Sequence, residues 1–210
     1  KSPNDMSVEY NLFKELLLRS KWEGSPLLRD RVLDLLNAVS ITFIQFKNEL
    51  EPPSSAVVAL SANAGNDLAS SLSCALNCVT DDHLLLERIC KFLESNDLSQ
   101  VKKLTNKTIP GIGHPSIKGE DPRVIGLLNS FKDIAKEKVN FYIEAENHLS
   151  ANINIGGAMC ALMLDAGIKK EYVLYFPLIG RLFGWCEIHS SIKKNFKKVV
   201  PSNIIINENN

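Results

Sequence analysis

The sequence lacks the features that mark several large protein classes. No apolar run approaches the roughly 18 residues that a membrane-spanning helix needs. The N-terminal segment has no secretory hydrophobic region, and because the chain does not begin with Met we expect it to start within a longer precursor. The 24 basic and 24 acidic residues cancel, so no global field attracts nucleic acid or anionic lipid. We therefore expect neither a membrane nor a nucleic acid among its partners.

Metal-binding patterns are also missing. The cysteines are odd in number and form no C-x-x-C pair, and no histidine or second cysteine pair completes a zinc set. Small core thiols are the expected role. Scattered thiols suit a reducing compartment, so we expect a cytoplasmic protein that binds no metal. The five cysteines are Cys74, Cys78, Cys90, Cys160 and Cys186.

What the sequence does carry is helical periodicity. From Leu28 to Phe46, apolar residues recur at spacings of three and four, which gives one long helical stripe. Pro52-Pro53 and Gly65-Asn66-Asp67 then break the chain, and Asp67 can cap the helix that follows. The β-prone stretch Val199–Ile206 has no partner strand to satisfy its backbone. The sequence therefore predicts an all-α fold.

Proline and glycine set the limits of the later helices. Pro122 fits a first helical turn, where its missing N–H is harmless, and the helix that it opens can continue towards Leu149. Asn152–Gly157 is a predicted break, and Gly167 ends a short helix of small residues. The predicted helices cover 28–46, a stretch through 57–60, 68–79, 84–93, a short piece at 98–104, 124–149, 158–164 and 172–196.

The most informative segment is Ile109-Pro110-Gly111-Ile112-Gly113-His114, followed by Asp121-Pro122-Arg123. Glycine permits close approaches that a Cβ would forbid. A neutral histidine can donate or accept a proton, and an arginine presents a planar fork to carboxylates. These residues predict one wall of a pocket for an anionic, carbonyl-bearing small molecule. The alternative is a rigid turn.

This block resembles the histidine loop of citrate synthases, which runs roughly P-G-x-G-H, a short spacer, then D-P-R. Four further segments are similar, in the same order, to motifs of that superfamily. They are Ser54–Ala56 with Ala62–Leu68, Thr80–Leu86, Gly157–Gly167 and Ile179–His189. From about Leu28 to Pro201, the chain resembles the citrate synthase superfamily. The likeness is greatest to its short members and to the citryl-CoA lyase portion of ATP-citrate lyases.

The resemblance implies an all-α, citrate synthase-like fold. A large helical domain, residues 1–83 and 166–210, would carry an inserted smaller helical domain, residues 84–165. The ligand would lie in the cleft between them. The resemblance also implies a homodimer or a multiple of dimers, with the active site completed across the subunit interface.

The family joins acetyl-CoA to oxaloacetate, which requires a base, donors aimed at developing oxyanions, and cations for the carboxylates. The resemblance assigns His83 to the enol oxygen and His114 to the ketone. Arg123 and Arg181 match carboxylate-binding arginines, and Ile109–Gly113 matches the loop that holds the adenine end of CoA. The structural alternatives are a histidine at a helix start for His83 and ordinary ion pairs for the arginines.

Other family residues are replaced in this chain. The catalytic aspartate falls on Gly156 in an ungapped match and on Asn154 in a shifted one, and neither residue is a general base. Asn48 stands where the family has a substrate-binding histidine, and we place Asn48 and Asn154 at the substrate. Val200 stands where the family has an arginine that reaches the neighbouring subunit. Nearby lysines would supply only a point charge.

Two functions follow from these observations. The first is an enzyme that forms or breaks a C–C bond between an acyl-CoA and a 2-oxo acid, or hydrolyses a citryl-CoA-type thioester. Its substrates would be a CoA ester and a small carboxylate. The alternative is a non-catalytic homologue that binds a CoA ester or small carboxylate and has a structural or regulatory role. Loss of a positioned base costs about 10²–10⁴ in rate, which separates the two.

Overall fold

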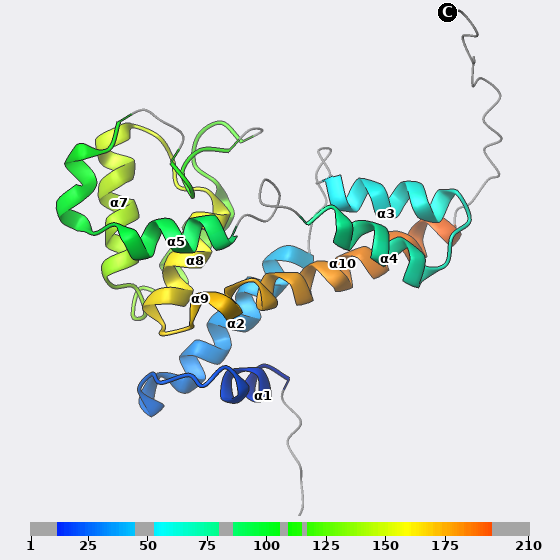
Figure 1. Cartoon of the computed structure of the whole chain (residues 1–210), viewed down its shortest axis with the longest axis horizontal. Coiled ribbons are helices and arrows are strands. Elements are labelled where there is room, and N and C mark those ends of the chain that lie inside the picture. The colour runs from blue at the N-terminus through cyan, green and yellow to red at the C-terminus, as the bar shows by residue number, and fades with distance from the viewer. Residues whose placement is uncertain (1–11, 45–52, 80–85, 106–108, 115–116, 195–210) are drawn as a thin grey trace, which may run out of the picture.

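Helices joined by short loops make up the structure, a computed structural model that describes residues 12–44, 53–79, 86–105, 109–114 and 117–194 (Figure 1). An isolated antiparallel bridge between Ile112 and Ile153 is the one β pairing within these ranges. The all-α prediction is confirmed. The elements are α1 (Leu12–Arg19), η2 (Pro26–Leu28), α2 (Arg29–Ile44), α3 (Pro53–Asn63), α4 (Leu68–Asn77), α5 (Leu86–Ser95), η3 (Leu98–Lys103), α6 (Pro122–Ser130), α7 (Glu137–Leu149), α8 (Ile155–Asp165), α9 (Lys170–Val173) and α10 (Tyr175–Lys194).

Local sequence signals locate most of these helices. The apolar stripe of α2 is buried as predicted, from Val32 to Phe43. Asp67 caps α4, because its carboxylate accepts a hydrogen bond from the Ser70 N–H at 2.7 Å. Gly167 lies just beyond α8 with φ +84°, a left-handed conformation that glycine adopts without a steric cost. Helix α1 was not predicted.

The helix predicted from Val124 to Leu149 is wrong as one continuous element. It divides into α6 and α7, with Phe131 buried in the turn between them. The Asp165 carboxylate accepts hydrogen bonds from the backbone N–H groups of Lys136, Lys138 and Val139, at 2.7–3.0 Å. These N–H groups lie at the start of α7, where a helix has no internal acceptors for them. A carboxylate from the end of α8 therefore starts a new helix. The break predicted at 152–157 is also shorter, since α8 begins at Ile155.

The main hydrophobic core surrounds α8. Residues 157–163 of this helix are all buried, and residues from α1, α2, α5, α6, α7 and α9 pack around them. A second, smaller cluster joins α3, α4 and α10 through Val58, Ala75 and Trp185. The two clusters show how the helices pack and do not test the division into domains. The predicted boundaries after residues 83 and 165 therefore stay a prediction.

Helices α2 and α10 link the two clusters (Figure 1). They pack with their backbones almost touching, because a Cβ at Gly180 would overlap the Ser40 carbonyl group. The Ser40 hydroxyl donates to the Phe176 carbonyl across the same contact at 2.8 Å. Arg181, the next residue along α10, is thereby held at a fixed position against α2. None of the described helices combines the length and apolar character that a membrane span requires.

Candidate active site

The segment 109–114 is pressed against the start of α8. Gly111 has φ +87°, and a Cβ there would meet the Tyr142 hydroxyl and approach the Gly157 Cα to 2.9 Å. A Cβ on Gly157 would in turn overlap the Gly111 carbonyl. The close approach predicted for this segment is therefore an approach of one backbone to another, and it requires glycine on both sides.

Hydrogen bonds fasten the same segment along its length. The Gly113 N–H donates to the Asn152 carbonyl at 2.8 Å, and the Asn154 N–H donates to the Gly111 carbonyl at 2.9 Å. The Tyr142 hydroxyl donates to the Pro110 carbonyl at 2.6 Å. With Ile109 buried beneath it, the segment forms a rigid support for the histidine that follows.

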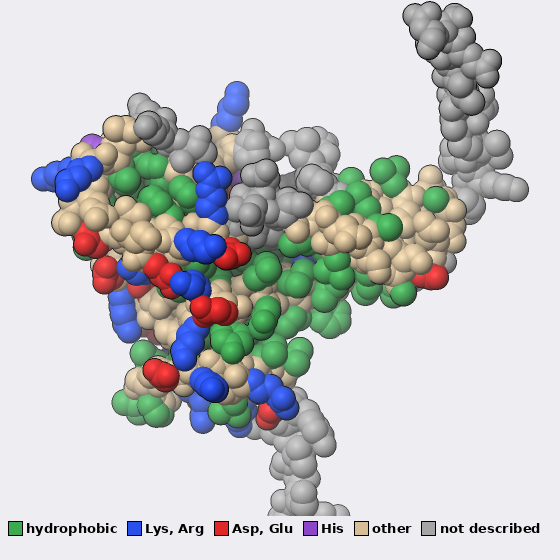
Figure 2. Space-filling view, viewed as in Figure 1, with side chains coloured by type: hydrophobic (Ala, Val, Ile, Leu, Met, Phe, Trp, Pro, Cys, Tyr) green, Lys and Arg blue, Asp and Glu red, His purple; other side chains and the backbone are tan. Residues whose placement is uncertain are grey.

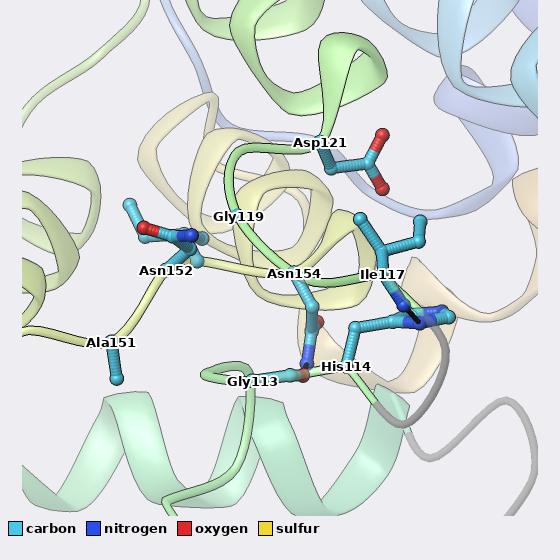
Figure 3. Close-up of a pocket in the computed structure, with 9 residues that line it drawn as sticks. Gly113, His114, Ile117, Gly119, Asp121, Ala151, Asn152 and Asn154 are labelled. Atoms are coloured by element: carbon cyan, nitrogen blue, oxygen red, sulfur yellow. Dashed lines mark hydrogen bonds between the residues drawn. The ribbon is translucent and has the colours of Figure 1, made fainter.

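His114 is half-buried, and the state of its ring follows from its contacts. The Ile117 N–H donates to Nδ1 at 3.0 Å, so the neutral ring carries its proton on Nε2 (Figure 3). Burial, together with the nearby charge of Arg123, holds the pKa of His114 below its ordinary value of 6.5. The ring is therefore neutral near pH 7 and has an Nε2–H donor, which is the form that can polarise a carbonyl oxygen.

Arg123 is held by its neighbour Asp121 at the start of α6. Its Nε and Nη2 donate to the Asp121 carboxylate, the shortest distance being 2.6 Å. That carboxylate is 4 % exposed and also accepts the Arg123 N–H, which makes it the cap of α6. Burial alone would raise the pKa of Asp121, but the hydrogen bonds and charge of Arg123 hold it below its usual value. The guanidinium is thus aimed by a carboxylate that stays ionised.

Arg181 is the second cation of the site and is only 3 % exposed. Its guanidinium carbon lies 5.1 Å from the centre of the Phe43 ring, a cation–π contact with α2. Burial and then the positive charge of Arg123 lower the pKa of Arg181 to about 10. The charge of Arg123 lowers the pKa of both Arg181 and His114, so Arg123 lies within electrostatic range of each of them.

A cavity of about 210 Å³ lies beside His114, with residues 113–114 and 117–121 on one side and residues 151–154 on the other (Figure 3). This volume is below the range of pockets that enclose drug-sized ligands. The described lining includes the Asp121 carboxylate and neither Arg123 nor Arg181. The residues that line it are Gly113, His114, Ile117, Gly119, Asp121, Ala151, Asn152, Ile153 and Asn154.

The segment Asn154–Gly157 packs against residues 109–114 and provides no carboxylate, and of its residues only Asn154 lines the cavity. Asn154 caps α8, with its Oδ1 accepting the Gly157 N–H at 2.9 Å and its Nδ2 donating to the Gly113 carbonyl at 2.8 Å. Gly156 is the other position at which the sequence comparison expected the family's aspartate. Asp165, further along α8, is engaged at the start of α7. Both possible registers therefore leave this segment without a general base.

Other sequence predictions have different outcomes. His83 and Asn48 lie outside the described residues, as do Val200 and Pro201. His189 is buried and bonded through Nε2 to the Asn66 carbonyl at 3.1 Å, which agrees with the packing role predicted for it. No group of three or more His, Cys, Asp or Glu side chains in the described part of the chain is arranged to hold a metal.

Sequence reasoning missed three residues that shape the site. Asp121 was quoted only as part of a motif, although an Asp directly before a helix-opening Pro is a recognisable cap signal. Tyr142 and Ile117 have no such signal. Tyr142 reaches Pro110 from a distant helix, and Ile117 acts through its backbone N–H.

Comparison with solved structures defines the fold. The citryl-CoA lyase from Hydrogenobacter thermophilus superposes with a TM-score of 0.77 at 20 % identity, over 98 % of this chain and 85 % of that one. The citrate synthase from Pyrobaculum aerophilum gives a TM-score of 0.67 at 17 % identity, over 93 % of this chain and 52 % of that one. The chain has the citrate synthase-like fold. The resemblance seen in the sequence is thus confirmed for the fold.

The same citrate synthase-like fold forms part of larger enzymes. An ATP citrate lyase from Methanothrix soehngenii, solved with citrate and coenzyme A, superposes with a TM-score of 0.61 at 19 % identity, over 78 % of this chain and 31 % of that one. No protein-family model and no curated protein sequence matches the chain. At these identities the superpositions establish the fold, and the site itself carries the argument about function.

Proposed function

We propose that this protein binds a CoA ester together with a small 2-oxo or 2-hydroxy carboxylate and acts on the C–C bond between them, as a citrate synthase or citryl-CoA lyase does. The observation that carries this proposal is the neutral His114 ring with its proton on Nε2, within electrostatic range of Arg123, whose charge also acts on Arg181. A donor to a carbonyl or alkoxide oxygen and cations for a carboxylate are what this substrate class requires.

The proposed binding site for CoA is the segment Ile109–Gly113. Its support is the rigidity of the segment, since Gly111 and Gly113 are both bonded to residues 152–154. The cavity beside His114 is too small for a whole CoA ester, so the acyl end would use it while the nucleotide lies outside. We propose that Asn154 also contacts the substrate, in addition to its hydrogen bonds with Gly113 and Gly157.

The wall formed by Asn154–Gly157 favours a second candidate, a non-catalytic protein that binds the same ligands. A positioned base contributes about 10²–10⁴ in rate. In this chain the candidate positions for that base hold a glycine and a capping amide. Asp121 is a poor replacement, because its carboxylate is already committed to Arg123 and its pKa is lowered.

Two assays on the same preparation separate these candidates. Citryl-CoA cleavage is followed by reducing the oxaloacetate that forms with NADH, and condensation by thiol release from acetyl-CoA plus oxaloacetate. Thermal shift with CoA, oxaloacetate and citrate reports binding. Turnover that disappears in His114→Ala supports the enzyme. Stabilisation without turnover supports the binder, and no response to any ligand contradicts both.

We also propose a homodimer in the cytoplasm. Its support is a set of exposed apolar side chains over the α3, α4 and α10 region, where Leu60 and Phe183 are 69 % and 62 % exposed (Figure 2). Leu68 and Leu76 extend the same region. All five cysteines are free thiols, which suits a reducing compartment. Sedimentation velocity tests the oligomeric state: a dimer is expected, and the double variant Leu60→Lys, Phe183→Lys should be a monomer.

A further inference from the structure

Helix α2 contacts the elements that carry both site arginines, at opposite ends of the helix. Near its C-terminal end, Phe43 lies against the Arg181 guanidinium of α10 at 5.1 Å. Near its N-terminal end, Arg31 is bonded to the chain at the C-terminal end of α6. Since Arg123 belongs to the first turn of α6, one helix relates the positions of two cations that are far apart in the sequence.

The contact between Arg31 and the end of α6 is specific. Its Nε and Nη2 each lie 2.8 Å from one oxygen of the Asp133 carboxylate, which is the bidentate geometry of a strong Arg–Asp pair. Nη2 also donates to the Ser130 carbonyl at 2.8 Å. The guanidinium carbon lies 5.0 Å from the centre of the Phe131 ring. The Arg31 side chain therefore contacts Ser130, Phe131 and Asp133, all at the C-terminal end of α6 or in the turn after it.

The carbonyl of Ser130 makes this contact directional. It is one of the last four carbonyls of α6, which have no donor within the helix and lie at the negative end of its dipole. A cation at this point satisfies the carbonyl and fixes the axis of the helix. Asp34 on α2 adds a weaker contact to Arg31 at 3.4 Å, which keeps the guanidinium turned towards α6.

We propose that Arg31 is a positioning residue for the carboxylate site: by joining α2 to the C-terminal end of α6, it sets the position of Arg123 relative to Arg181. The two guanidinium groups carry like charges that repel each other, and the charge of Arg123 lowers the pKa of Arg181. Without a fixed axis for α6, this repulsion favours their separation. The part of the proposal that concerns ligand binding rests on the proposed function, whereas the part that concerns α6 does not.

The test compares Arg31→Ala with a matched control, Lys170→Ala. Lys170 pairs with Glu94 at 2.7 Å, and the side chains of that pair are 36 % and 40 % exposed, against 40 % and 46 % for Arg31 and Asp133. The control therefore removes an equally exposed ion pair between α9 and α5. Hydrogen exchange of the α6 amides and titration calorimetry with citrate and with CoA are measured for both variants.

In Arg31→Ala, the α6 amides should exchange faster and the Kd for citrate should rise by about 2- to 30-fold, the range expected for a residue that acts through another. The Kd for CoA should not change, because the 109–113 segment is held by other contacts. Asp133→Ala should reproduce the effect, and the double variant should be no worse than either single one. Arg31→Lys should restore part of it, since lysine keeps the charge but lacks the fork.

Three outcomes overturn the proposal. These are α6 exchange equal to that of the wild type, an equal loss of affinity for citrate and CoA, and the same loss in Lys170→Ala. If the wild-type protein binds neither ligand, the proposed function fails. The exchange of the α6 amides, Arg123 included, then still decides whether Arg31 holds that helix.

Discussion

The two walls of the site, residues 109–114 and residues 154–157, have the same kind of backbone framework and different chemical content. In the first wall, the hydrogen bond from the Ile117 N–H to Nδ1 leaves the proton of the neutral His114 ring on Nε2. In the second wall, the polar side chain is that of Asn154. Its hydrogen bonds stabilise the fold, because they cap α8 and hold the Gly113 carbonyl. The comparison teaches that two segments in close backbone contact can differ in whether their polar side chain is engaged in the fold.

Restoring a carboxylate to the second wall should have the largest effect. We expect Gly156→Asp to raise the rate of condensation by about 10²–10⁴, because a positioned base contributes that much. A Cβ at Gly156 would lie 3.1 Å from the Ile89 Cδ1 and 3.3 Å from the Asn154 Oδ1, so the end of the Ile89 side chain has to shift by a few tenths of an ångström. Thiol release from acetyl-CoA plus oxaloacetate measures the gain. Asn154→Asp tests the alternative sequence register. If neither variant increases the rate of thiol release, the view that this wall faces the substrate is contradicted.

Removing the donor from the first wall comes next. We expect His114→Ala to lower turnover by roughly 10²–10³, the usual cost of losing one donor to a developing oxyanion. The Kd for CoA should stay unchanged, because the glycines before His114 keep their bonds. The control is His148→Ala, which alters an exposed histidine that contacts only the Leu104 carbonyl among the bonds described for it. A similar loss in the control would show that the effect is not specific to the site.

Separating the walls should destabilise the protein. We expect Gly157→Ala to lower the free energy of unfolding by about 1–3 kcal/mol, since the added methyl group meets the Gly111 carbonyl and neither backbone can move freely. The matched control is Gly126→Ala in α6, where nothing lies within 4 Å of the new Cβ. That change should stabilise the protein by about 0.5–1 kcal/mol. Urea unfolding of both variants measures the difference, and equal stability of the two would contradict the close contact.

A pH titration gives the smallest expected effect. The pKa of His114 in the folded protein is held below 6.5, its ordinary value, so the folded state binds fewer protons than the unfolded chain. Its contribution to stability is therefore complete above pH 6.5 and decreases as the pH falls towards the lowered pKa. Urea unfolding between pH 8 and pH 5 should show a shallower decline in His114→Gln than in the wild type. An unchanged slope would mean that the ring is not shielded as described.

The sequence was sufficient where structure depends on near neighbours. The stripe of α2 and the cap at Asp67 are encoded within a few residues, and both are confirmed. It failed where a distant group intervenes. No local signal between Phe131 and Lys136 predicts the start of α7, because the group that caps this helix is the distant Asp165 carboxylate.

The site shows the same division. Motif order predicts site roles for His114, Arg123 and Arg181, and the charge of Arg123 lowers the pKa of the other two. Their roles stay a prediction. The tautomer of His114 could not be predicted, because it depends on the backbone N–H of Ile117. The role of Asn154 could not be predicted either, since the same amide is equally suited to a ligand and to a helix cap.

The contact between Gly111 and Gly157 has a consequence for recognising proteins of this kind. Each glycine occupies the space that a side chain on the other would need, so a change at one position requires the two chain segments to separate. A search for diverged relatives should therefore use this glycine pair, with the histidine that follows the first member, as its marker. The presence of an aspartate would then sort the relatives into those equipped for catalysis and those that are not.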